Sequence, residues 1–218
     1  MIVPVRNDAA ALTRLLSRLK QMNATALEVI VVDGGSEDDS AAVAGQLGAT
    51  VVSGPPSRGT QLNAGFRAAR GHWIWMLHAD TQVSRAALTF IRSLRAPGWG
   101  RFDVAFEPDS AGMRVVAALM NVRSRLSGIC TGDQGIFCER RLLERIGGIP
   151  EQPLMEDVEL CRRLKALSRP IASRVRLTTS ARRWRRQGYL RTIIAMWALR
   201  LRYWLGERPD VLVRNYYG

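Results

Sequence analysis

The chain has 218 residues and a mass of 24.3 kDa, enough for one large domain or two small ones with a buried core. Hydrophobic residues make up 47% of it and charged residues 23%, which excludes the disordered and collagen-like classes. No run of apolar residues approaches the ~20 that a membrane-spanning helix needs. The first residues also lack the pattern of a secretory signal, so we expect a cytoplasmic protein.

The positive charge of this sequence is unevenly placed. The net charge is +13, and residues 162–218 alone hold fifteen basic and two acidic residues. Such clustering is typical of proteins with an anionic partner: a nucleic acid, a membrane surface or a phosphorylated substrate. The three cysteines, Cys130, Cys138 and Cys161, include no Cys-x-x-Cys pair, so we expect buried thiols in a reducing compartment rather than disulfides or a zinc site.

The first half of the chain alternates strands with helices. Short apolar runs predict strands at 2–5, 29–32, 50–53 and 73–77, and helical periodicity predicts helices at 9–22, 38–47, 59–70 and 84–95. Strands that alternate with helices form a mostly parallel sheet with helices on both faces, an α/β fold. The second half is less regular, with strands expected at 102–107, 135–138 and 171–177 and helices at 113–126, 142–146, 157–167 and 190–205.

Polar side chains follow the predicted strand ends. Asp33, Arg58 and Asp80 each come shortly after a strand, and ligands bind beyond the carboxyl ends of parallel strands. The sequence therefore predicts a site with two carboxylates and an arginine at one sheet edge. No repeat or linker interrupts the chain, which we divide into a domain at 1–185 and a basic, amphipathic helical extension at 186–218 that packs on it.

Six segments resemble, in order, the motifs of the inverting family-2 glycosyltransferases of the GT-A fold. They are IVPVRND at 2–8, VVDGGS at 31–36, RGTQLNAG at 58–65, LHADT at 77–81, GDQG at 132–135 and EDVEL at 156–160. The likeness is greatest to the small bacterial branch associated with arsenosugar biosynthesis. It implies a Rossmann-like GT-A enzyme that transfers a sugar, with inversion, from a nucleoside diphosphate sugar to an acceptor hydroxyl. Family prevalence favours a UDP-sugar over a GDP-sugar.

The resemblance also assigns the donor side of the site. Asp33 is expected to contact the nucleoside, and Asp80 a divalent Mn²⁺ or Mg²⁺ ion as the last acid of the Asp-x-Asp motif. Arg58, which follows a Pro-rich loop and precedes a helix, can bond a phosphate or a base carbonyl of the nucleotide. His78 replaces the first acid of that motif, and Gly34 replaces a second acid often found beside Asp33. The other donor-side residues that match are Pro4, Val5, Asn7, Gln61 and Asn63.

On the acceptor side, Asp157 matches the family's general base, and repulsion from Glu156 and Glu159 is expected to raise its pKa. The other acceptor-side residues are Gly132, Asp133, Gln134, Glu156, Arg183 and Trp184, where the family's Gln-x-x-Arg-Trp motif lacks its Gln. A turn at Asp33 and helix caps at Asp80 and Asp157 are the structural alternatives. Two other functions stay open: a nucleotide-binding GT-A protein without transfer activity, and a basic nucleic-acid-binding protein.

The last predicted helix carries a continuous apolar stripe. Its members are Leu190, Ile193, Ile194, Trp197, Leu201, Trp204 and Leu205. One interpretation is that the stripe packs on the domain or on a second subunit. The other is that it lies on the inner face of an anionic membrane, where it brings a lipid-linked acceptor to the site.

Overall fold

The computed structural model describes residues 1–217, except for the side chains of residues 183, 186, 187, 190 and 215–217. Three strands pair in parallel in the order β1-β2-β3, and four pair in the order β4-β6-β5-β7. Their bounds are β1 Ile2–Val5, β2 Ile30–Asp33, β3 Thr50–Ser53, β4 Trp73–Trp75, β5 Trp99–Glu107, β6 Phe137–Glu139 and β7 Ile171–Ser180. A parallel bridge between Ile2 and Met76 joins the two sheets into one layer in which only β6 runs antiparallel to its neighbours.

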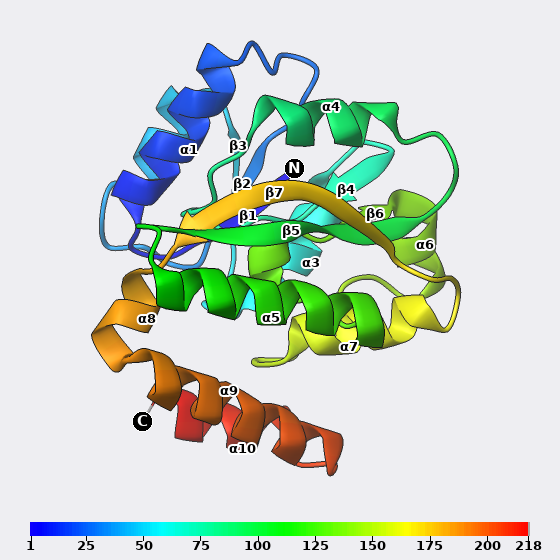
Figure 1. Cartoon of the computed structure of the whole chain (residues 1–218). Coiled ribbons are helices and arrows are strands. Elements are labelled where there is room, and N and C mark those ends of the chain that lie inside the picture. Colours follow the sequence, from blue (N-terminus) through cyan, green and yellow to red (C-terminus); the bar gives the residue numbers. More distant parts are fainter. Residues whose placement is uncertain (218) are drawn as a thin grey trace.

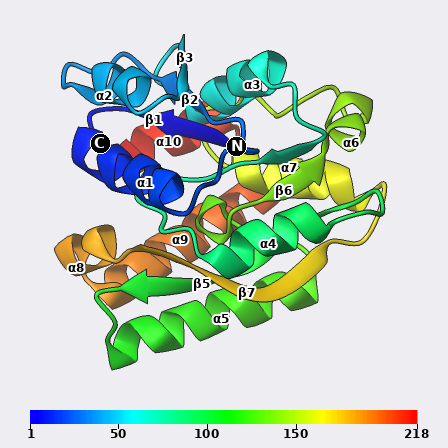
Figure 2. The same ribbon diagram turned by 90° about the horizontal axis from the view of Figure 1, so that it is seen from above.

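Helices cover both faces of this layer (Figures 1 and 2), which confirms the predicted α/β fold. One face carries α1 (Ala9–Gln21), α2 (Ser40–Gln46) and α4 (Arg85–Ser93), and the other carries α3 (Arg58–Ala68), α5 (Ala111–Ser127), α6 (Arg140–Arg145) and α7 (Glu156–Lys165). Alternate strand residues point to opposite faces. Val3 and Val5 of β1 thus pack with α1, while Ile2 packs with α3.

The second half of the chain departs most from the prediction. Strand β5 begins at Trp99 and β7 ends at Ser180, three residues beyond each predicted limit, because these two strands pair with each other along their length. The charged Arg101 interrupts the apolar pattern near the start of β5, so the sequence does not predict a strand there. In the structure Arg101 is completely buried and forms an ion pair with Asp103. The three cysteines are free and buried, as predicted.

Three helices follow β7: α8 (Arg182–Gln187), α9 (Tyr189–Trp204) and α10 (Pro209–Tyr217). Leu199 of α9 and Leu212 of α10 pack on Met155, directly before α7, and the Tyr203 hydroxyl donates to Glu159 Oε2 at 3.2 Å. Figure 1 shows α9 and α10 as an outer layer beneath α5 and α7. None of the helices within residues 1–217 is long and apolar enough to cross a membrane.

Most of the apolar stripe of α9 does not pack on the domain, so that part of the first interpretation is wrong, while packing on a second subunit stays a prediction. Ile194, Trp197, Leu201, Trp204 and Leu205 are exposed, and only Ile193 is partly covered. The side of α9 that faces the domain is instead marked by Thr192 and Leu199, which are buried. The helical wheel identified a real apolar face, but the helix turns that face outward. Leu190 lies outside the described side chains.

Candidate functional site

The loops after β1 and β2 are held together by side chains from the predicted donor side. Asn7, with a φ of 52°, donates its N–H to Ser36 Oγ at 2.9 Å and accepts the Glu37 N–H at 2.7 Å. The buried Gln61 amide donates to the carbonyls of Val5 at 3.0 Å and Val32 at 2.8 Å. These contacts fix the carboxyl ends of β1 and β2 side by side. Pro4 lies within β1 and is half-buried.

Asp33 ends β2 with one carboxylate oxygen occupied and one free. Its Oδ2 accepts the N–H groups of Gly35 at 3.1 Å and Ser36 at 3.0 Å, so the predicted turn is present. Its Oδ1 is buried and has no hydrogen-bond partner within residues 1–217. A buried acceptor without a partner is costly unless a ligand supplies the donor. A base N–H or a ribose hydroxyl fits this requirement.

Asp80 lies beside a second carboxylate that the sequence analysis missed. Its Oδ1 accepts the Thr179 hydroxyl at 3.3 Å. Desolvation by burial and then the negative charge of Asp8 raise the pKa of Asp80. Arg182 forms an ion pair with Asp8, in which Nη2 donates to Oδ2 at 2.8 Å, although 174 positions separate the two residues in the sequence. Two carboxylates and an arginine thus meet where β1 and β4 end. Asp8 is the last residue of the segment IVPVRND, the first of the six that resemble the family's motifs. Its place in that segment could have identified it as a candidate site residue.

His78 replaces the missing motif acid without supplying a charge. Its Nε2 lies 3.7 Å from Asp133 Oδ1. Desolvation and then the positive charge of Arg58 lower the pKa of His78 well below its ordinary value. The imidazole is therefore neutral at pH 7. A neutral imidazole can position Asp133, but it brings no negative charge toward a cation.

Asp157 sits in the first turn of α7 and is anchored by the loop opposite. The Gly132 N–H donates to its Oδ2 at 3.1 Å, and the Val158 N–H donates to its Oδ1 at 2.8 Å. The N-cap position itself is Met155, whose side chain makes no cap bond. Asp157 is half-buried and remains open on one side. A carboxylate held in this way can accept a proton from a hydroxyl placed against it.

Glu156 pairs with Arg58 directly beside Asp157. Arg58 Nη1 donates to Glu156 Oε1 at 2.9 Å. Desolvation raises the pKa of Glu156 to about 7, with Arg58 opposing the shift and Asp157 adding to it. A Cβ at Gly132 would overlap the Arg58 guanidinium, so the glycine is what lets these two segments meet. Arg58 thus lies nearer the predicted acceptor side than its predicted role at the phosphates implies.

Several predicted residues are bound into the fold. Asn63 accepts the Ile149 N–H at 3.0 Å and donates to Glu151, which holds the loop that leads to α7. Gln134 is completely buried and donates to Ser124 Oγ at 2.9 Å on α5, so in this structure it has no surface for an acceptor. Trp184 packs edge-on against Phe106 with ring centroids 5.9 Å apart. The side chain of Arg183 lies outside the described part.

The comparisons with known proteins agree with this geometry. Residues 1–91, which contain Asp33, Arg58 and Asp80, match the family described as Glycosyl transferase family 2. The family match ends before Gly132 and Asp157. The narrower likeness to the arsenosugar branch stays a prediction.

Solved structures extend the similarity of fold to most of the chain. A mannosyltransferase from Pyrobaculum calidifontis, in complex with GDP-Man and Mn²⁺, has a TM-score of 0.66 and 23% identity, over 91% of this chain and 59% of that one. Staphylococcus aureus TarS has a TM-score of 0.68 and 16% identity, over 83% and 59%. Mycobacterium tuberculosis glucosyl-3-phosphoglycerate synthase, with Mn²⁺ and UDP-Glc, has a TM-score of 0.51 and 16% identity, over 82% and 68%. These similarities show a GT-A fold.

A relative among the curated proteins matches a smaller share of this chain. An uncharacterized protein of Mycobacterium tuberculosis is 30% identical over 112 residues, which are 49% of this chain and 34% of that protein. The chain thus spans about a third of the length of this relative and 59% of the mannosyltransferase. The binding and the chemistry therefore have to be argued from this chain's own residues.

One half-buried arginine near the candidate site was missed by the sequence analysis. Arg123 of α5 has its Nε and Nη2 atoms buried, with no hydrogen-bond partner among the described side chains and backbone. Burial lowers its pKa, and the negative charge of Asp157 opposes that shift. Buried guanidinium nitrogens without a partner are costly, and an anionic ligand group would satisfy them. Arg123 thus adds a candidate anion contact near Asp157.

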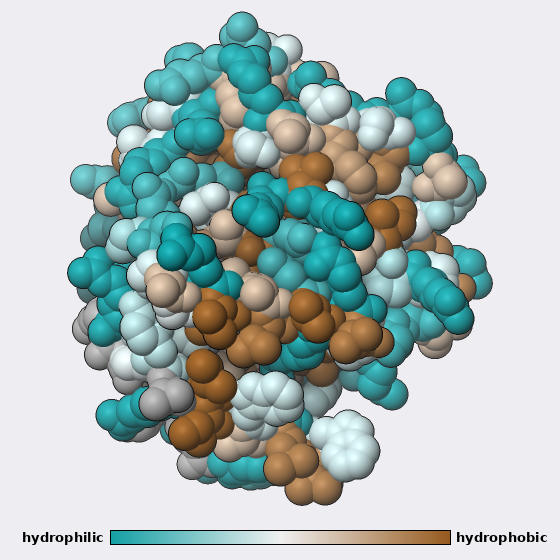
Figure 3. Space-filling model, viewed as in Figure 1, coloured by the Kyte–Doolittle hydropathy of each residue, from teal (hydrophilic) through white to brown (hydrophobic). Residues whose placement is uncertain are grey.

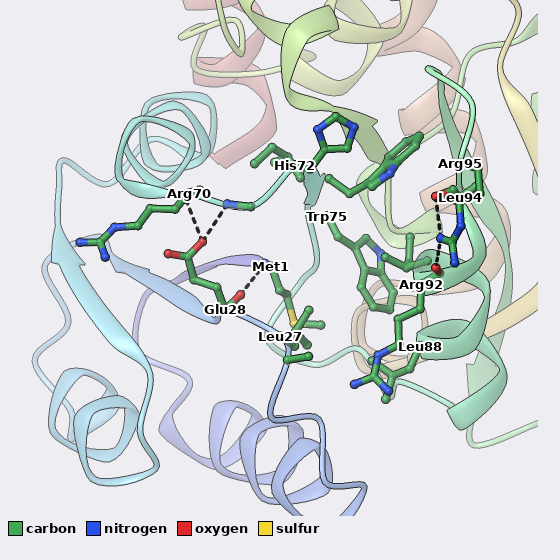
Figure 4. Close-up of a pocket in the computed structure, with 16 residues that line it drawn as sticks. Met1, Leu27, Glu28, Arg70, His72, Trp75, Leu88, Arg92, Leu94 and Arg95 are labelled. Atoms are coloured by element: carbon green, nitrogen blue, oxygen red, sulfur yellow. Dashed lines mark hydrogen bonds between the residues drawn. The ribbon is translucent and has the colours of Figure 1, made fainter.

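A cavity of about 670 Å³ lies at the other edge of the sheet (Figure 4). Its lining includes Met1, Glu28 and Trp73, which stand at the amino ends of β1, β2 and β4. The Glu28 carboxylate accepts the N–H groups of Arg70 at 2.8 Å and Gly71 at 3.2 Å. Asp33, Asp80 and Asp157 belong to the carboxyl edge instead. The cavity is therefore separate from the candidate site.

Proposed function

We propose that the chain transfers a sugar from a nucleoside diphosphate sugar, with UDP-sugars favoured, to an acceptor hydroxyl with inversion. The observation that carries the proposal is the meeting of two halves of the sequence. Arg58, from the part that matches family 2, bonds Glu156, and the next residue is Asp157. A donor-binding edge and a candidate base are thereby brought to one place. In this proposal residues 1–185 form the catalytic domain and 186–218 an extension of it.

The donor side uses groups that the fold leaves available. The free Oδ1 of Asp33 accepts a hydrogen bond from the nucleoside. Arg182 turns from Asp8 to the diphosphate, because phosphate oxygens match the planar guanidinium better than one carboxylate does. Asn7 and Gln61 act as positioning residues that hold the strand ends, and Pro4 and Val5 form the floor of the nucleotide site.

A divalent metal fits beside the diphosphate. Asp80 is the proposed ligand, with Asp8 next to it, and a cation would relieve the repulsion that raises the pKa of Asp80. No cluster of three or more His, Cys, Asp or Glu side chains occurs in the described part of the chain, so donor oxygens would complete the shell. The metal would supply charge neutralisation for the departing diphosphate. The mannosyltransferase and the synthase, each in complex with Mn²⁺ and a nucleotide sugar, support this assignment.

Asp157 is the proposed base of the transfer. The acceptor oxygen attacks the anomeric carbon from the face opposite the diphosphate, and its proton passes to Asp157 as the new bond forms. The bond from the anomeric carbon to the diphosphate oxygen breaks, and its electron pair leaves with the diphosphate. Gly132 holds Asp157 for this step. Arg123 favours an acceptor with an anionic group, and Asp133, beside His78, lines the same side.

The proposal is tested by measuring thermal stability with UDP- and GDP-sugars, with and without Mn²⁺, and then the release of nucleoside diphosphate. We expect one donor class to raise the melting temperature more with Mn²⁺ than without it, and that donor to be slowly hydrolysed. In the matched variant Asp80→Asn, most of the Mn²⁺-dependent increase in melting temperature should be lost. No stabilisation by any nucleotide sugar contradicts the proposal. Stabilisation without hydrolysis or transfer favours the nucleotide-binding alternative.

A further inference from the structure

Two helices turn apolar side chains toward solvent on the same face of the molecule. On α5 these are Val115, Leu119, Val122 and Leu126, and on α9 and just after it they are Ile194, Trp197, Leu201, Trp204 and Leu205. Figure 3 shows hydrophobic side chains gathered over α5 and below it, on the side viewed in Figure 1. We call this set the α5–α9 face. Its outermost members, Leu126 and Trp204, are 83% and 80% exposed.

The spacing shows that this exposure is a property of whole helix faces. Positions 115, 119, 122 and 126 recur every three or four residues, as do 194, 197, 201 and 204, so each set lies along one side of its helix. The opposite sides of both helices pack against the rest of the protein, since Met113 and Val116 of α5 and Leu199 of α9 are buried. Contiguous apolar surface of this kind on a soluble domain marks an interaction site.

The charge of the two helices indicates what the α5–α9 face contacts. Neither helix contains an acidic residue, and each contains three arginines: Arg114, Arg123 and Arg125 on α5, and Arg191, Arg200 and Arg202 on α9. Three of the six pair with acids that lie outside the two helices, which lowers the positive charge of the face but leaves it free of unpaired acidic groups on α5 and α9. The whole chain carries +13. A second copy docked face to face would bring like charges together, whereas an anionic lipid surface would attract them. Trp197 and Trp204 suit the headgroup region, where an indole keeps its N–H in the polar layer.

We propose that the α5–α9 face docks on an anionic lipid bilayer. The apolar side chains enter the boundary between headgroups and acyl chains, and the arginines at its border, such as Arg114 and Arg191, contact lipid phosphates. Docking is peripheral, because no described helix could span a membrane. The inference goes beyond the proposed sugar transfer and does not depend on it.

Docking in this orientation places the bilayer near the catalytic helix. Helix α9 holds α7 through Leu199 on Met155 and through the Tyr203 hydroxyl on Glu159. A lipid-linked acceptor could then enter from the membrane side toward Asp157. This consequence rests on the proposed function, while docking itself is measured without any substrate.

The test is flotation of the full chain with phosphatidylcholine vesicles and with vesicles that also contain phosphatidylglycerol. We expect binding only to the anionic vesicles, weakened at high salt because the arginines are screened. Leu126→Glu/Trp204→Glu should reduce binding by about tenfold or more, since it removes apolar contact and adds repulsion. The matched control Ala10→Glu/Val51→Glu adds the same charge at exposed positions of α1 and β3.

The outcomes separate the possible occupants of the face. Both variants should melt like the parent protein, because all four side chains are exposed. Wild-type protein that stays with the soluble fraction at low salt overturns the proposal, as does equal loss of binding in the control variant. A concentration-dependent dimer in sedimentation, abolished by Leu126→Glu/Trp204→Glu without vesicle binding, assigns the face to a second copy instead.

Discussion

Arg58 and Glu156, which lie 98 residues apart in the sequence, form an ion pair of 2.9 Å between the first residues of α3 and α7. Removing one partner of a buried pair leaves the other uncompensated and usually costs about 3–5 kcal/mol. The side chain of Glu156 is almost fully buried, so its carboxylate depends on Arg58. The pair therefore couples the donor edge to the position of Asp157.

The raised pKa of Glu156 predicts a specific pH dependence of stability. In the unfolded chain this carboxyl titrates near 4.5, and in the folded protein near 7. Between these values the folded state binds more protons, so the free energy of unfolding falls as pH rises from about 4.5 to 7. Glu156→Gln should remove this contribution, at most about 3 kcal/mol.

Urea unfolding at pH 5 and pH 8 measures the effect of Glu156→Gln. The difference in unfolding free energy between wild type and the variant isolates Glu156 from other titrating groups. We expect the wild type to lose more stability than the variant on going from pH 5 to pH 8. Glu144→Gln, at an exposed carboxyl of α6, is the control and should leave the wild-type dependence unchanged. Equal pH dependence in wild type and Glu156→Gln would refute a raised pKa.

Asp33→Asn is expected to weaken nucleotide binding while keeping the fold. The amide oxygen of Asn can still accept the Gly35 and Ser36 N–H groups, but its NH₂ replaces the free Oδ1. Loss of a hydrogen bond to a charged acceptor predicts about 10- to 100-fold weaker binding. Calorimetry with the stabilising nucleotide measures it. Asp39→Asn, exposed and of equal charge change, should bind like wild type. Unchanged affinity in Asp33→Asn would remove Asp33 from the site.

The strands of the first half could be predicted because their sequences have little ambiguity. Short β-branched runs bounded by Gly, Pro and Asp gave β1 and β3 with their observed limits and β2 within one residue. Ser84 is the N-cap of α4 as predicted, and it accepts the Ala87 N–H. Local patterns were sufficient here since each element is short and its ends carry turn residues.

The site could be predicted only in part, because its contacts are long-range. Motif order singles out Asp33, Asp80 and Asp157 as candidates, but nothing local shows that Arg182 reaches Asp8. The same limit explains Gln134, which a loop motif places near an acceptor although its amide is used inside the fold. The outward turn of the α9 stripe was also hidden, since periodicity shows that a helix has two faces but not which one is covered.

Arg123→Met is expected to stabilise the protein and to reduce its response to phosphate. Replacing a guanidinium whose Nε and Nη2 are buried without partners by an apolar side chain is neutral or favourable, and about 1 kcal/mol corresponds to a rise of roughly 2–4 °C in melting temperature. Thermal shifts with and without inorganic pyrophosphate measure both effects. Arg114→Met, at an exposed arginine of the same helix, should change neither. A variant that melts several degrees lower would show that Arg123 has a structural partner.

Asp157→Asn tests the base most directly, because it removes the proton-accepting carboxylate while keeping the shape of the side chain and one of its two hydrogen bonds. The Asn carbonyl can still accept the Gly132 N–H, so the loop opposite α7 should keep its place. General-base catalysis contributes roughly 10²- to 10⁴-fold, and we expect sugar transfer to fall by that factor while the affinity for the donor stays within about twofold. The fall in sugar transfer is measured from initial rates with the donor that stabilises the protein against heat. The affinity for that donor is measured by calorimetry. The charge-matched Asp39→Asn should transfer at the wild-type rate. If Asp157→Asn also transfers at that rate, the base is a different residue, and Asp133 on the facing loop becomes the next carboxylate to replace.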